Sequence, residues 1–285
     1  MRVKHTIYRF TVAITLMVML ASVASAFDLP SPRSYGMGQT AVLSRSTAAE
    51  AVNIGHGLEQ AGDWSFDIGY VRRFEMKDLD RVFVIGAGRW RAVTVGFGAA
   101  QFGRTDLYAE QTLKGTISVE WSRWTLGGSV SGQQIEIGNG YGGLRAASFG
   151  FTMAYRHPEF VLALTGDDLN RPSYIEGSPE REPSGDLYAE YIGARGYTLT
   201  GHIRVEHLQT PRFGLGQTIR LSDKAGLFWG LSTNPLEFGG GLEILIPSGA
   251  LSYATSVHPV LGFTHAVTLS LGNHLTRAIT RAGLD

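Results

Sequence analysis

The chain has 285 residues, no cysteine, and 25 basic against 25 acidic side chains, so it is formally neutral. Nucleic-acid binding needs concentrated positive charge to displace counterions from phosphates, and this balance argues against a nucleic-acid partner. An exported chain without disulfides needs a core large enough to fold unaided, which this length permits. Glycine is frequent, at 37 residues, and its spread through apolar stretches suits closely approaching or sharply curved sheet.

The first 26 residues have the parts of a secretory leader. Basic residues precede the apolar run VAITLMVML, and Ala24 and Ala26 give the small-residue spacing of a signal-peptidase site. A retained membrane anchor is the alternative, but the run is shorter than a spanning helix. We therefore expect residues 1–26 to be a cleaved signal peptide.

Residues 27–62 are rich in Gly, Ala and Ser and resemble neither a strand nor a long helix. Small side chains permit close backbone approach, and irregular backbone at membrane depth is tolerated only where protein or lumen water satisfies it. Such a segment is suited to the interior of a larger structure. A short periplasmic helix around STAAEAVN is the alternative.

From residue 63 to residue 272 apolar and polar side chains alternate with the period of a strand. In VTVGFG, for example, Val95 and Phe97 face one way, whereas Thr94 faces the other. We predict fourteen strands, near 63–74, 80–88, 91–102, 107–121, 124–137, 146–155, 160–166, 187–194, 197–208, 212–222, 225–233, 237–246, 250–257 and 264–272.

The connections after even-numbered strands are short, such as RW at 89–90 and SR at 122–123, and most of the others are longer. An even number of strands with short turns at one end is typical of an outer-membrane barrel, and closure removes the exposed sheet edges. Trp90, Trp121 and Trp124 lie beside short turns, as in an interfacial aromatic girdle.

These observations predict an all-β fold, a transmembrane antiparallel up-and-down β-barrel of about 14 strands in contact with the lipid of the bacterial outer membrane. Residues 63–272 would form the barrel and residues 273–285 a periplasmic tail. A soluble exported β-protein is the alternative.

The stretch PRSYGMGQTA resembles the N-terminal signature of outer-membrane barrels related to the FadL long-chain fatty acid transporters, and it is most similar to the PorV/PorQ group. Asn53, Gly57 and Leu58 resemble a second element of that signature, although NIGHGL lacks its proline and carries an extra residue. GDDLNRPSY at 166–174 and the closing block GLFWGLSTNPLEFGGGLEI extend the resemblance. The residues that match the first element are Arg33, Gly36, Met37, Gly38 and Ala41.

The resemblance implies fourteen strands with the N-terminal segment inside the lumen, and it implies transport of hydrophobic small molecules. An accessory barrel of a protein secretion system, which binds protein partners as in the PorV/PorQ group, is the alternative. We expect residues 27–62 to plug the lumen, with a turn at Gly36 and Gly38 and with Asn53 capping or turning the chain toward the first strand. The lumen and plug candidates are Arg33, Gly36, Met37, Gly38 and Asn53.

The stretch TLTGHIRVEH places Thr200, His202, Arg204 and Glu206 on one strand face. We interpret them as lumen-lining polar residues, with Arg204 and Glu206 compensating charges on neighbouring strands; a metal site or proton relay is the alternative. The acidic stretch between Asp167 and Asp186 suggests a solvated loop. Because no catalytic or cofactor-binding motif is present, we expect no enzyme, no cofactor and no metal.

Overall fold

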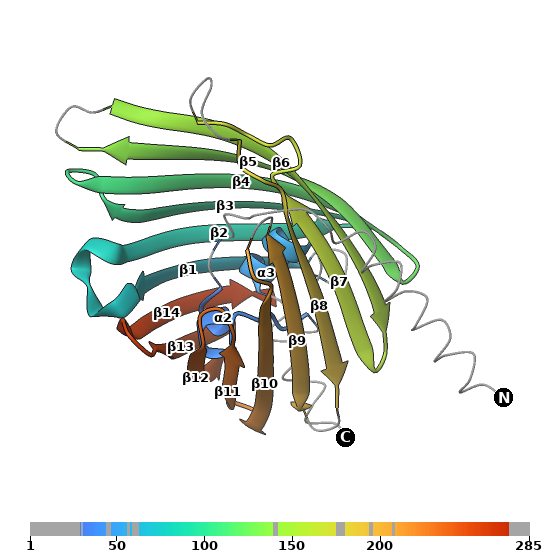
Figure 1. Ribbon diagram of the computed structural model, residues 1–285. Coiled ribbons are helices and arrows are strands. Elements are labelled where there is room, and N and C mark those ends of the chain that lie inside the picture. Colours follow the sequence, from blue (N-terminus) through green and yellow to red (C-terminus); the bar gives the residue numbers. More distant parts are fainter. Residues whose placement is uncertain are drawn as a thin grey trace.

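The computed structural model describes residues 29, 31–43, 47–55, 58, 63–138, 142–174, 180–193, 196–206 and 209–273. The expected signal peptide, residues 1–26, and all of the expected tail after Asn273 lie outside this part of the chain. Figure 1 shows a ring of strands with two short helices inside it. Neither of these helices is long and apolar enough to cross a membrane.

Fourteen strands form one closed barrel in which each strand pairs with its neighbours in the chain and β1 pairs with β14. All pairings are antiparallel, and Phe66 opposite Leu271 lies in the closing ladder. The predicted all-β barrel and its strand number are confirmed. The strands are β1 Trp64–Arg72, β2 Asp80–Trp90, β3 Val93–Arg104, β4 Tyr108–Trp121, β5 Trp124–Ile137, β6 Gly142–His157, β7 Phe160–Asp167, β8 Ser184–Ile192, β9 Thr198–Glu206, β10 Arg212–Ser222, β11 Ala225–Ser232, β12 Glu237–Ile246, β13 Gly249–His258 and β14 Gly262–Gly272.

Several predicted boundaries differ by a few residues, and three examples show pairing that continues past the points where turn residues suggested an end. Trp90 still pairs with Val93, so the turn is at 91–92 and not at 89–90. Strand β6 begins at Gly142, which pairs with Ile137. Strand β8 begins at Ser184, opposite Asp167.

The two ends of the barrel differ in their connections. Two-residue turns at 91–92, 122–123 and 223–224 mark the short-turn end, whereas the connections 73–79 and 168–183 belong to the long-loop end. Residues 73–79 contain two 3-10 turns, η1 (Arg73–Glu75) and η2 (Lys77–Leu79). In outer-membrane barrels the short turns face the periplasm.

The outer face of the wall is apolar, as the alternation predicted. Phe97 is 58% exposed while its neighbours on β3, Gly96 and Gly98, are buried. Trp90 and Trp121, at the short-turn end, are 71% and 76% exposed. A belt of this kind suits hydrocarbon rather than water, and it argues against a soluble β-protein. Other exposed side chains of the belt include Val95, Leu113, Ile117, Leu126, Val130, Phe149, Leu215 and Phe238.

The helices are α2 (Pro32–Gly36) and α3 (Ala48–Ile54). Thr47 begins α3 through a capping box with Glu50, and Gly55 ends it in the left-handed conformation (φ 70°), which glycine adopts without steric cost. Asn53, expected to cap or turn the chain, instead lies within α3 and donates from Nδ2 to the carbonyl of Leu29 (2.7 Å). Its side chain thus ties the helix to the segment that precedes α2.

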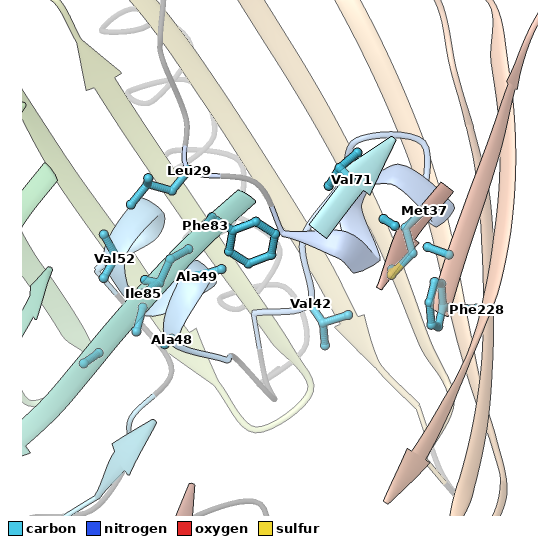
Figure 2. Packing of buried hydrophobic residues seen from close by; sticks show 14 of the residues in the cluster. Leu29, Met37, Val42, Ala48, Ala49, Val52, Val71, Phe83, Ile85 and Phe228 are labelled. Carbon is cyan, nitrogen blue, oxygen red and sulfur yellow. The ribbon is translucent and has the colours of Figure 1, made fainter. Parts of the chain in front are cut away.

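Residues 31–43 and 47–55, here called the inner segment, share a hydrophobic core with the inside of the barrel. Figure 2 shows Leu29 and Val52 beside Phe83 and Ile85 of β2, and Met37 beside Phe228 of β11. Ile85 and Met37 are fully buried. Part of the lumen wall that the inner segment contacts is therefore apolar, although many other inward positions are polar.

Candidate functional site in the barrel lumen

The first half of the inner segment lies directly against inward glycines of the wall. A Cβ atom added to Gly230 of β11 would lie 2.3 Å from the carbonyl carbon of Met37, and one added to Gly239 of β12 would lie 2.4 Å from the carbonyl oxygen of Tyr35. Gly214 of β10 would meet the carbonyl oxygen of Gly38 at 2.3 Å. The inner segment thus occupies space that a side chain at any of these three positions would fill. This close approach is one reason for the many glycines in the barrel wall.

Polar contacts fix this half to several strands. Arg33, which is buried, forms an ion pair with Glu243 of β12. The Thr40 hydroxyl lies 3.0 Å from that of Thr200 on β9. The backbone N–H of Leu43 donates to the Glu190 carboxylate of β8. Contacts to three separate strands hold the segment across the lumen.

The second half, α3, is held on the other side of the barrel. The N–H of Ala49, in its first turn, donates to Oδ2 of Asp67 on β1 (2.8 Å), where a carboxylate also meets the positive end of the helix. At the other end of α3, Ser118 of β4 donates to the carbonyl of Gly55 (2.8 Å), and Thr152 of β6 donates to that of Ile54. Both helix ends therefore use wall side chains as partners.

A cavity of about 340 Å³ lies between the inner segment and the wall. Its wall residues come from the long-loop end of the barrel: η1, the start of β2, the end of β9 and the start of β10. The polar part of its lining comprises Arg73, Arg81, His202, Arg204, Glu206 and Arg212, and the inner segment contributes Tyr35, Gln39, Thr40, Glu50 and Ile54 among others.

The structure brings three of the four lumen-lining candidates into this cavity. His202, Arg204 and Glu206 line it. Nε of Arg204 lies 2.7 Å from Oε1 of Glu206 on the same strand, and Arg204 also lies 3.6 Å from Asp186 of the neighbouring strand β8. Thr200 faces the inner segment and is 1% exposed. Nε2 of His202 forms a hydrogen bond with Oδ1 of Asp186 (2.7 Å), and its ring stacks on Tyr188 with ring centroids 4.5 Å apart. Its other nitrogen, Nδ1, has no hydrogen-bond partner among the described residues, so no hydroxyl group is bonded to it there.

Of the plug candidates, Arg33, Gly36, Met37 and Gly38 all contact the wall strands β10–β13 or their side chains. Gly38 has φ +64°, the left-handed conformation that glycine adopts without steric cost, whereas Gly36 is the last residue of α2. Sequence reasoning missed Arg73, Arg81 and Arg212. Arg81 carried a signal, since it shares the inward face of β2 with Phe83 and Ile85.

The expectation of a solvated acidic loop is wrong for its two ends. Asp167, Asp168 and Asp186 are at most 7% exposed. Strand β7 extends to Asp167 and strand β8 begins at Ser184, so Asp167 and Asp186 belong to the barrel wall and not to the loop. Asp167 lies 3.4 Å from Nζ of Lys114 and Asp168 lies 2.7 Å from Arg181. Within the described residues, no group of three His, Cys, Asp or Glu side chains is arranged to hold a metal ion.

Comparison with solved structures finds outer-membrane barrels. The toluene transporter TodX of Pseudomonas putida matches with a TM-score of 0.57 and 9% identity over 87% of this chain and 97% of TodX. A mutant of the TodX monoaromatic hydrocarbon channel matches with a TM-score of 0.58 and 9% identity over 85% of this chain and 97% of that one. No protein-family model matches the chain. No curated protein matches it in sequence. The chain thus has the fold of these outer-membrane barrels.

Proposed function

We propose that the protein is a gated outer-membrane channel for small molecules and that the inner segment is its gate. The observation that carries this proposal is that the inner segment crosses the lumen. Arg33 is tied to Glu243 of β12, and Gly55 is tied to Ser118 of β4, which lies six strands away in the ring of fourteen. Neither contact belongs to the backbone ladder of the barrel, so both can break without opening the barrel.

Two cavities of the described residues adjoin α2. The 340 Å³ cavity includes Ser34 and Tyr35 in its lining, whereas Arg33 and Val42 face a second, smaller cavity of about 40 Å³ that reaches Gly226 and Leu245 near the short turns. The two cavities therefore lie on different sides of α2. The Arg33–Glu243 ion pair lies at the smaller one, where it would have to break for a molecule to pass.

For the substrate we propose hydrophobic or amphipathic small molecules, the class that the resemblance to FadL-related proteins implies. The similarity in fold to TodX, a toluene transporter, supports this class. Tyr35 and Ile54 of the inner segment, together with Leu29, supply part of the cavity lining with apolar atoms.

Single-channel recording in planar bilayers tests the gate. We expect Glu243→Gln to open more often than the parent protein, because it removes the charge that holds Arg33. Glu159→Gln is the matched control, since Glu159 is exposed in the turn between β6 and β7. The exchange Arg33→Glu with Glu243→Arg should restore the closed state. Equal opening in all four proteins contradicts the gate.

Uptake of radiolabelled toluene by cells that carry Glu243→Gln tests the substrate class separately. Uptake no faster than in cells without the protein contradicts a hydrophobic substrate, whatever the conductance shows. An accessory barrel of a secretion system, as in the PorV/PorQ group, is the alternative function. It predicts a silent bilayer for every variant and co-purification of secretion components with the parent protein.

A further inference from the structure

Four arginines line the cavity at the long-loop end, and they come from opposite sides of the barrel. Arg73 and Arg81 belong to η1 and β2, whereas Arg204 and Arg212 belong to β9 and β10. Strands β2 and β9 are seven positions apart in a ring of fourteen, so they face each other across the lumen. Positive charge therefore borders the same cavity from two sides.

Two of these guanidinium groups have unused hydrogen-bonding capacity. Nε of Arg73 and Nε of Arg81 are buried without a hydrogen-bond partner, and neither side chain forms an ion pair within the described residues. Each lies over an aromatic ring, that of Phe74 (5.2 Å) and that of Phe102 (5.4 Å). Burying a charged donor without a partner is unfavourable, so an acceptor in the cavity would stabilise both.

The opposite side also has donors to offer. Arg212 donates to the uncharged Oε1 of Gln39 (2.6 Å) and to the carbonyl of Asn234 (3.1 Å), and it makes no ion pair with a carboxylate of the described residues. His202 is 4% exposed, and its Nδ1 atom has no partner.

The two carboxylates in the cavity lining do not neutralise these groups. Glu206 is engaged by Arg204 at 2.7 Å. Glu50 accepts from Oγ of Ser31 (2.9 Å) and from the N–H of Thr47 (2.6 Å) within the inner segment. Four arginines against two glutamates give the lining side chains a net charge of +2. Asp186, outside the lining, pairs with His202 and Arg204, so the arginines without a carboxylate partner among the described residues are Arg73 and Arg81 on one side and Arg212 on the other.

We infer that this cavity is a binding site for a small organic molecule with two or more oxyanion groups, such as a polycarboxylate or a phosphate ester. One oxyanion would accept from Arg73 and Arg81, and the other from Arg212 and His202. Guanidinium groups suit this task because they bind carboxylate and phosphate oxygens in a bidentate manner. A volume of about 340 Å³ fits a small metabolite. Binding of such an anion does not depend on the proposed function. Only its passage through the barrel would depend on the proposed channel.

Titration calorimetry on the full-length protein in a neutral detergent tests the site, with citrate and inorganic phosphate as the probes and glucose as the uncharged reference. We expect citrate to bind, glucose not to bind, and the double variant Arg73→Gln with Arg81→Gln to weaken citrate at least tenfold. Arg212→Gln, on the opposite side, should weaken it as well. Arg123→Gln, exposed in a short turn, should bind like the parent protein.

The shift in gel mobility between unheated and boiled samples shows whether each variant has folded. Equal citrate affinity in the folded double variant, in Arg212→Gln and in the Arg123→Gln control would overturn the site. Binding of decanoate without binding of citrate or phosphate would overturn the multiply charged class in favour of a single-headed amphiphile. None of these binding measurements needs an open channel. A negative binding result therefore does not contradict the proposed gate, and the absence of conductance in a bilayer does not contradict the proposed anion site.

Discussion

The two halves of the inner segment are held inside the same barrel by different means. Around α2, backbone lies on backbone, because Gly214, Gly230 and Gly239 leave no side chain between wall and segment. Around α3, side chains pack, because Val52 and the alanines of the helix meet Phe83 and Ile85. The first half is therefore sensitive to added atoms, and the second half is sensitive to removed atoms.

The largest effect is expected where the α3 half loses packing. Ile85 is fully buried in the cluster that joins β2 to α3, so Ile85→Ala removes its contacts and leaves a cavity. We expect a loss of about 2 to 5 kcal/mol in the free energy of unfolding. Urea titration followed by the gel mobility of the folded band measures it. A loss below about 1 kcal/mol would show that α3 does not depend on this core.

The wall behind α3 supplies the next test. Phe97 points outward between Gly96 and Gly98, whose missing side chains make room for Val52 and Leu29. Phe97→Arg places a charge in hydrocarbon and should cost about 2 to 4 kcal/mol. Thr94→Arg, on the inward face of the same strand, should cost less, because water in the lumen can hydrate the guanidinium. Equal losses in the same urea assay would argue against lipid on the outer face.

In the α2 half the expected damage comes from a single added carbon. Gly230→Ala would place Cβ 2.3 Å from the carbonyl carbon of Met37 and 2.5 Å from the carbonyl oxygen of Leu215, so the backbone must shift on both sides. We expect a loss of about 1 to 3 kcal/mol and faster proteolysis within residues 31–43. Gly201→Ala is the control, since nothing lies within 4 Å of its added Cβ. Similar stability and proteolysis of the two variants would show that the close approach of the inner segment to Gly230 does not matter.

The smallest effect concerns the start of α3. Thr47→Ala removes the capping-box hydroxyl and should destabilise the helix locally by about 0.5 to 2 kcal/mol. Hydrogen exchange of the α3 amides should accelerate while exchange in the strands stays unchanged. Uniform acceleration throughout the barrel would mean that α3 and the wall unfold together.

The barrel itself was predictable from the sequence, whereas much of its interior was not. Lipid and lumen impose opposite polarity on Phe97 and Thr94, so period two reveals both the strand and its outward face. No such rule connects Arg81 with Arg212, because strand order does not tell which inward side chains meet at the same height across a lumen. The close approach of the inner segment to Gly214 and Gly230 could not be predicted either, since a glycine in a strand also suits a bend.

The most direct test of the gate joins Thr40 to Thr200, whose hydroxyl oxygens lie 3.0 Å apart in a chain without cysteine. The double variant Thr40→Cys with Thr200→Cys should form a disulfide, whereas Thr40→Cys with Gly201→Cys, on the outward face, should not. In a planar bilayer the oxidised Thr40–Thr200 pair should stay closed, and a reductant should restore openings. Failure to cross-link, or equal opening before and after reduction, would contradict a lumen gated by the inner segment.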